Sequence, residues 1–242
     1  SSGRILFGAG DDTNKLQMDT VYRFEEVSVP GGYILDSTPH YFVLPGNDTD
    51  ELKAKIQECD ALKDAEIEYT TTSYGPTITV TNQEKTTSIN FAAIKELKGA
   101  DLTAEQFSFR LVQTNETWTD EIPSTEQIKT NQEDGTVDFD SIPYRYDQSL
   151  NYSAGDENTA KYYYILQEVI TNTKPDVNGD WIEQDQTIYH ITVTVTQDGN
   201  GDLQAQASYA TAQEGEADQP YTPEENGAVK FVNRKAGLTE IS

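Results

Sequence analysis

The stretch AKYYYILQEVIT, residues 160–171, alternates apolar and polar side chains as a half-buried β-strand does. Side chains two residues apart on a strand point to the same side. One face therefore carries, in order, Tyr162, Tyr164, Leu166 and Glu168. This pattern predicts a core strand that turns an acidic side chain toward an otherwise apolar interior.

Two other predicted strands end in the same way, each with a different polar group. SINFAAIK, residues 88–95, closes its apolar face with Lys95, and AVKFVNR, residues 228–234, brings Asn233 into phase with Val229 and Phe231. An amine, an acid and a carboxamide would thus enter one apolar core. A buried charge is costly, so a neutral amine beside a neutral acid is the cheaper state. Because a neutral amine can attack a carboxamide carbon, the pattern indicates a protein that forms a covalent bond within itself.

The region around these strands, residues 87 to 235, is nearly all strand-like. Turn-rich connections separate seven candidate strands, at residues 88–95, 106–113, 136–142, 160–171, 186–197, 202–210 and 228–234. That number of short strands predicts an immunoglobulin-like or related two-sheet sandwich.

Residues 1 to about 84 read as strands around one helix. Strands are expected at residues 21–29, 41–44 and 76–82, and a helix is expected within DTDELKAKIQECDALKD, residues 48–64. Its apolar positions recur every three or four residues and include Cys59, which is expected to be a small core residue. The polar stretch from Gln83 to Thr87 is expected to link the two segments.

The first segment repeats part of the pattern of the second. An aromatic alternating strand, with Tyr22 and Phe24, leads to Glu26, and a closing strand, with Ile78 and Val80, leads to Asn82. The same acid and carboxamide geometry therefore occurs twice in the sequence, which makes coincidence a poorer explanation.

Charge and cysteine content exclude several classes of protein. A formal net charge of −25 argues against nucleic acid or an anionic membrane as a partner. A single cysteine excludes an intrachain disulfide framework. No apolar stretch has the length of a membrane span, and no signal peptide is present, so both ends are expected to be cut edges of a longer protein.

Several motifs resemble those of Gram-positive surface and pilus proteins. YRFEEVSVPGGY, residues 22–33, is similar to the YxLxExxxPxGY motif of Cna B-type domains. IKELKGADLTAEQFSFRL, residues 94–111, together with YYYILQE and VKFVN, resembles the streptococcal-type pilin isopeptide-linkage domain. The resemblance implies a mostly β fold of two tandem immunoglobulin-like or Cna B-type sandwiches, with one short helix in the first. Residues 1–84 would be a partial Cna B-type domain that lacks its first strand or strands, and residues 85–242 the pilin domain.

The resemblance also implies roles for single residues. Lys95 would be the amine and Asn233 the carboxamide of an isopeptide bond, while Glu168 would hydrogen-bond the amide oxygen and shuttle protons as ammonia leaves. Lys98 is a nearby rival, but it precedes a glycine turn and is expected to be solvated.

In the first segment Glu26 and Asn82 match the acid and the carboxamide of the Cna B-type family. The partner lysine belongs to a first strand that this chain does not contain, and Lys15 lies in the wrong region, just upstream of the glutamate strand.

The implied protein is a structural stalk, pilin or adhesin fragment at the cell wall of a Gram-positive bacterium, outside the cell. Its implied partners are other pilus or surface-protein subunits, and sortase through regions outside this chain; the host or cell-surface ligand is unknown. Because the bond would form once per molecule, the protein would not be an enzyme in the turnover sense. No cofactor and no metal are expected.

Two alternatives stay open. One is a carbohydrate- or calcium-binding module of a secreted enzyme, because DVNGDWIE (residues 176–183) and DGNGD (residues 198–202) superficially resemble calcium loops. Neither has full EF-hand spacing, and hairpin turns explain both. Trp118 and Trp181, expected in loops, are too few for a carbohydrate platform. The other alternative is the stalk of a tip adhesin whose binding domain lies elsewhere.

Overall fold

A computed structural model of the protein describes residues 16–44, 46, 49–69, 79–153, 159–171, 181–212, 215, 217–224 and 227–236. The chain divides into two compact units, Ser1–Glu84 and Lys85–Ser242.

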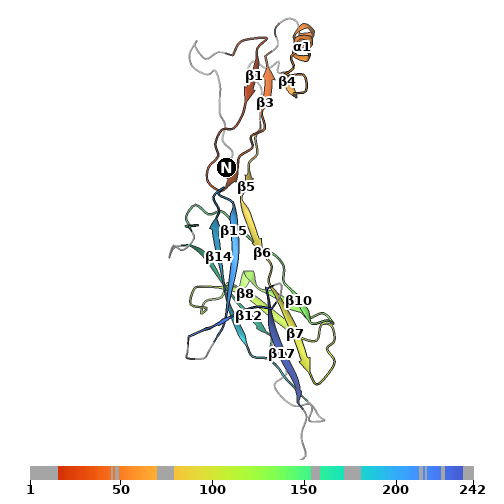
Figure 1. Ribbon diagram of the computed structural model, residues 1–242, viewed down its shortest axis with the longest axis vertical. Coiled ribbons are helices and arrows are strands. Elements are labelled where there is room, and N and C mark those ends of the chain that lie inside the picture. The colour runs from red at the N-terminus through yellow and green to blue at the C-terminus, as the bar shows by residue number, and fades with distance from the viewer. Residues whose placement is uncertain are drawn as a thin grey trace, which may run out of the picture. The chain divides into compact units, whose positions relative to one another are not determined.

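The second unit contains two principal sheets (Figure 1). The four-stranded sheet has the order β10 (Thr136–Asp138), β7 (Ala92–Lys98), β17 (Ala228–Ala236) and β13 (Trp181–Glu183). The six-stranded sheet has the order β16 (Gln219–Tyr221), β15 (Leu203–Thr211), β14 (Ile188–Gln197), β12 (Ala160–Glu168), β8 (Ser108–Thr114) and β9 (Gln127–Thr130). A separate pair joins β6 (Thr86–Ile89) to β11 (Ile142–Arg145), and a short 3-10 turn, η1, covers Pro123–Thr125.

The core of the second unit forms where alternate side chains of the two sheets meet. Phe109 of β8 packs on Phe231 of β17 with ring centroids 5.1 Å apart, and Phe91 packs on Tyr164 of β12 at 5.4 Å. Each of these rings is almost fully buried, which removes a large apolar surface from water. The prediction of a mostly β fold is confirmed.

β7 and β17 come from opposite ends of this unit's sequence and lie side by side (Figure 1). They pair in parallel, from Ala92 opposite Ala228 to Lys98 opposite Arg234. All other strand pairs of this unit are antiparallel within the part of the chain that the structure describes. The first and last long strands are thus neighbours, which brings residues far apart in sequence to one place.

The first unit is built on a small sheet with one helix. The sheet has the order β1 (Val21–Phe24), β3 (His40–Val43) and β4 (Ile67–Tyr69), and a second pair joins β2 (Tyr33–Ile34) to β5 (Gln83–Glu84). Leu52 and Ile56 of α1 (Thr49–Gln57) pack with Val43 of β3. The helix thereby covers one face of the sheet, as its one-sided apolar pattern predicts.

The expectation that Cys59 is a core residue is wrong. The helix ends at Gln57, and the chain continues through turns in which Cys59 donates its N–H to Ile56 and Leu62 donates to Cys59. The apolar spacing continues in the sequence, but the helical geometry that would turn Cys59 toward the core ends at Gln57, so Cys59 is exposed.

Several predicted boundaries also differ from the structure. The expected linker, Gln83 to Thr87, is largely strand: Gln83–Glu84 form β5, and β6 begins at Thr86. Of the expected strand 76–82, residues 76–78 lie outside the described residues and residues 79–82 join no sheet. Trp181 lies in β13 rather than in a loop. These elements are short, and a two- or three-residue strand carries too little alternation to be recognised.

The described residues contain a single α-helix, the nine-residue α1. It has neither the length nor the apolar character of a membrane-crossing helix, and no other helix of the described residues has them.

Candidate functional site

The structure brings Lys95, Glu168 and Asn233 together inside the second unit. The Lys95 Nζ lies 2.5 Å from the Oε2 of Glu168, and the Nδ2 of Asn233 donates a hydrogen bond of 2.7 Å to Glu168 Oε1. One carboxyl group therefore contacts the amine through one oxygen and the carboxamide nitrogen through the other.

Strand register explains this meeting. Lys95 of β7 lies opposite Phe231, and Asn233 of β17 lies opposite Leu97, two positions further along the same parallel pair. Partners on neighbouring strands share a face, so Lys95 and Asn233 project to the same side as diagonal neighbours. Glu168 approaches from β12 of the facing sheet, where it pairs with Phe109.

A turn before β10 fixes the backbone at Lys95. The Lys95 N–H donates 2.7 Å to the carbonyl of Gly135, which adopts a φ of +90°. A Cβ at this position would lie 2.3 Å from the Lys95 carbonyl oxygen, so only glycine permits this approach. The amine-bearing strand is thus held on both edges, by β17 and by this turn.

The site excludes water. The side chains of Lys95 and Glu168 have no exposed surface, and Asn233 is fully buried as well. The Lys95 amine also lies 4.7 Å from the ring centre of Phe107. Burial lowers the pKa of Lys95, although the hydrogen bond with Glu168 acts against this effect. Burial therefore favours the neutral amine.

Lys98 has no comparable environment. Its side chain is half exposed and lies 3.7 Å from the carboxylate of Glu96, a contact that surface screening makes weak. Of the two candidate lysines, Lys95 is the one that contacts the Glu168 carboxyl group, which in turn contacts the Asn233 carboxamide.

Two further residues at this site, Gln184 and Asp185, were not predicted from the sequence. Gln184 Nε2 donates 2.7 Å to Glu168 Oε1, and the backbone N–H of Asp185 donates 2.7 Å to Asn233 Oδ1. The amide oxygen therefore accepts from the backbone of Asp185, while Glu168 accepts from the amide nitrogen; the expected hydrogen bond from Glu168 to the amide oxygen is absent here. Both residues follow the short strand β13, in a polar stretch without periodicity that could have pointed to them.

In the first unit Glu26 and Asn82 also meet. The Nδ2 of Asn82 donates 2.9 Å to Glu26 Oε1 in a partly buried setting. The remaining oxygens, Glu26 Oε2 and Asn82 Oδ1, are buried and accept no hydrogen bond within the described part of the chain. Buried acceptors without donors are costly. These two oxygens can therefore accept hydrogen bonds from a further donor. Lys15 lies outside the described residues.

The DGNGD stretch, residues 198–202, is the turn between β14 and β15. Its carbonyl oxygens face an amine: Lys85 Nζ donates 3.1 Å to Asn200 and 2.9 Å to Gly201. Among the described residues no group of three or more histidine, cysteine, aspartate or glutamate side chains is placed to hold a metal ion. Most of the other loop-like stretch, at residues 176–180, lies outside the described residues.

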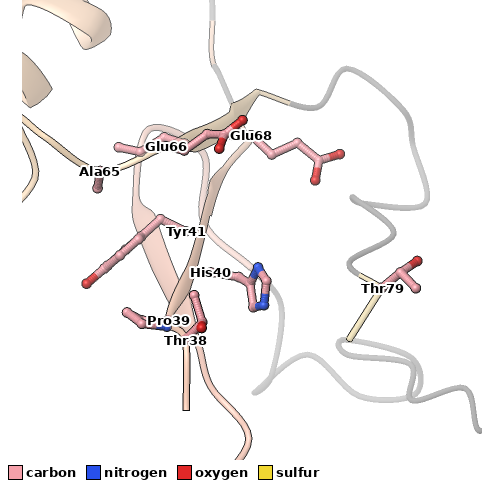
Figure 2. A pocket seen from close by; sticks show the side chains of 9 residues that line it. Thr38, Pro39, His40, Tyr41, Ala65, Glu66, Glu68 and Thr79 are labelled. Carbon is pink, nitrogen blue, oxygen red and sulfur yellow. The ribbon is translucent and has the colours of Figure 1, made fainter. Parts of the chain in front are cut away.

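A pocket of the first unit lies beside β3 and β4, and Figure 2 shows the His40 ring directed toward the side on which Thr79 lies. The buried His40 Nε2 has no partner within the described residues. None of the predicted site residues lines this pocket, whose walls are formed by Thr38, Pro39, His40, Tyr41, Ala65, Glu66, Ile67, Glu68 and Thr79.

The family model FctA, described as the Spy0128-like isopeptide containing domain, matches residues 91–235, more than half of the chain. The chain belongs to the FctA family. The match covers the strands that carry Lys95, Glu168 and Asn233, and it confirms the resemblance of the second unit to Gram-positive pilin domains. The resemblance of the first unit to Cna B-type domains stays a prediction. Among curated proteins none matches the chain.

Two solved structures are similar to this FctA-family chain. A crystal structure of a mutant of the major pilin from Streptococcus pyogenes is 12% identical, with a TM-score of 0.32. The match covers 61% of this chain and 50% of the pilin chain. The structure of the major pilin protein from a Streptococcus pyogenes serotype is 14% identical, with a TM-score of 0.32. That match covers 63% of this chain and 54% of the pilin chain. The chain spans about half the length of these pilins, and the family assignment rests on the domain match alone.

Proposed function

We propose that this FctA-family chain is part of the shaft or stalk of a pilus or surface fibre, and that an isopeptide bond from Lys95 to Asn233 stabilises its second unit. The observation that carries the proposal is that the buried Glu168 contacts both Lys95 and Asn233, which lie on the paired first and last long strands. A carbohydrate- or calcium-binding module is not favoured, because the family match is to an isopeptide containing domain.

The proposed chemistry follows from the contacts of Glu168. The carboxylate takes a proton from the Lys95 ammonium, and the neutral Nζ adds to the Cγ of Asn233. The proton then passes from Glu168 to Nδ2, the Cγ–Nδ2 bond breaks, and ammonia leaves. Nζ gives its second proton to the Glu168 carboxylate, and the Nζ–Cγ amide bond remains. Folding supplies the proximity that this otherwise slow reaction needs. The reaction uses each site once, so the protein does not turn over.

The direct test of this chemistry is an intact-mass measurement. We expect the folded chain to have a mass about 17 Da below that of its sequence, because one ammonia is lost. Glu168→Ala removes the group that carries the proton, so this variant should recover the full mass. A wild-type chain without the deficit would refute the isopeptide bond.

The same spectrum reports on Glu26 and Asn82. We propose that this pair is the acid and carboxamide of a second isopeptide bond, whose lysine lies outside the described residues. The buried oxygens of the pair, which accept no hydrogen bond from the residues that the structure describes, support this proposal. A loss of about 17 Da means that one bond has formed, whereas a loss of about 34 Da means that a lysine of this chain also reaches Asn82. If the loss is about 34 Da, Asn82→Ala should reduce it to about 17 Da, the loss expected for one bond.

The lowered pKa of Lys95 gives a further prediction for a chain that cannot react. In Asn233→Ala, the folded protein releases the Lys95 proton at a lower pH than the unfolded chain. The unfolded state then binds more protons over this interval, so stability should rise as the pH rises toward about 10.4. Denaturant midpoints from about pH 7 to about pH 10 measure this rise. The control, which combines Asn233→Ala with Lys95→Met, should lack this rise in stability. If both variants show the same dependence of stability on pH, the prediction is contradicted.

Pilins are cell-surface proteins of Gram-positive bacteria, and they assemble with other pilus subunits. We propose the same location and the same kind of partner for this chain, with attachment by sortase through other regions of the protein. The net charge of −25 suits such a site, because it keeps an exposed protein soluble.

A further inference from the structure

We propose that the turn at Gln184 and Asp185 is a catalytic element of bond formation: the Asp185 backbone N–H stabilises the oxyanion, and Gln184 positions Glu168. This inference rests on the proposed isopeptide chemistry and names two residues that the lysine, acid and carboxamide scheme leaves out.

The Asp185 N–H is placed at the atom on which charge develops. When Lys95 Nζ adds to Cγ, the carbonyl double bond of Asn233 opens and Oδ1 becomes negative. The Asp185 N–H already lies 2.7 Å from this oxygen, and Asn233 is fully buried. A fixed backbone donor in such a place stabilises the transition state more than the neutral carboxamide.

The same hydrogen bond orients the carboxamide. With Oδ1 on the Asp185 N–H, the nitrogen Nδ2 must face Glu168, which it meets at 2.7 Å. The reversed amide would set two donors against each other at Asp185 and turn Oδ1 toward the carboxyl group. The turn thereby places the leaving nitrogen beside the group that delivers its proton.

Asp185 holds its own N–H in place through its side chain. One carboxylate oxygen accepts 2.9 Å from the Thr187 N–H, which closes the turn, and the other accepts 2.7 Å from the Val232 N–H, next to Asn233 on β17. The donor and the carboxamide are therefore fixed to each other, which is the preorganisation that an oxyanion site needs.

Gln184 fixes the acid. Its Oε1 accepts 2.9 Å from the Thr171 N–H, and its Nε2 donates 2.7 Å to Glu168 Oε1. Glu168 Oε1 thus has two donors, Gln184 and Asn233, which leaves Oε2 for the Lys95 amine. Gln184 touches no reacting atom of Lys95 or Asn233 in these contacts, so it acts as a positioning residue.

The experiment measures the rate of ammonia loss as the full chain folds. The chain is kept in denaturant so that it has neither folded nor reacted, and it is then diluted into buffer. Its intact mass is followed with time, and intrinsic fluorescence reports folding in parallel. We expect Asp185→Ala to react at least about tenfold more slowly than wild type, because the donor is no longer held, and Gln184→Leu to be slowed about tenfold. Asp147→Ala is the matched control, since Asp147 also closes a turn, onto Ser149, but away from the site; its rate should equal that of wild type.

A second modification separates the oxyanion role from a structural one. Replacing the Asp185 amide by an ester through semisynthesis removes the N–H and keeps every side chain, so folding should be retained while the rate falls about 100-fold or more. The ester variant also tests the oxyanion role if Asp185→Ala does not fold. A folded ester chain that loses ammonia at the wild-type rate would overturn the oxyanion role, and an unchanged rate for folded Gln184→Leu would overturn the positioning role. Wild type that never loses ammonia would instead refute the isopeptide bond itself.

Discussion

Lys95→Met is expected to lower the free energy of unfolding of the second unit by roughly 4 to 5 kcal/mol. The bond from Lys95 to Asn233 would close a loop of 138 residue steps (233 − 95). A cross-link over so long a loop removes many conformations from the unfolded chain, which raises the free energy of that state. Methionine has a similar length and suits the apolar surroundings of Phe107, so the loss reports mainly the missing bond.

Denaturant unfolding of wild type, Lys95→Met and Lys98→Met measures this effect. Lys98 is half exposed on the same strand, so Lys98→Met should change stability by less than about 0.5 kcal/mol. Glu168→Gln is a second way to prevent the bond, because the amide cannot carry the proton while its shape is kept. Equal midpoints for wild type and Lys95→Met would contradict a cross-link at this site.

The three residues of the candidate site could be predicted from alternation along strands. Lys95, Glu168 and Asn233 each continue an apolar face by two residues, and the parity of a strand decides which side a residue enters. That rule also separates Lys95 from Lys98, which differ by three positions and so face opposite sides. The family motifs then supplied the roles, which alternation alone cannot.

The turn that completes the site could not be predicted. Gln184 and Asp185 form hydrogen bonds with Glu168, Asn233 and Val232, which lie 16 to 48 residues away. Such contacts depend on how the sheets pack, and a turn has no period that reveals them. Cys59 shows the same limit in the first unit, because a regular apolar spacing continues in the sequence after the helix itself has ended.

The direction of β7 and β17 determines how the second unit bears a load. The strands are parallel, so a force that pulls the start of β7 away from the end of β17 acts along both strands. It loads all of the ladder hydrogen bonds between them in shear rather than opening them one by one. An isopeptide bond between Lys95 and Asn233 would join the same two strands covalently. The force would then pass through this bond, and the residues between Lys95 and Asn233 would not bear it.

Single-molecule pulling across the second unit should therefore give the largest difference between wild type and Lys95→Met. In the variant, 138 residue steps (233 − 95) become free to extend, which adds on the order of 480 Å of contour length at about 3.5 Å per residue. In wild type this increment should be absent, because the force passes from Lys95 through the cross-link to Asn233 and only residues outside that loop can extend. Lys98→Met should behave as wild type. A full-length unfolding step in wild type would show that the two strands are held by hydrogen bonds alone, and the proposed role as a load-bearing stalk would lose its basis.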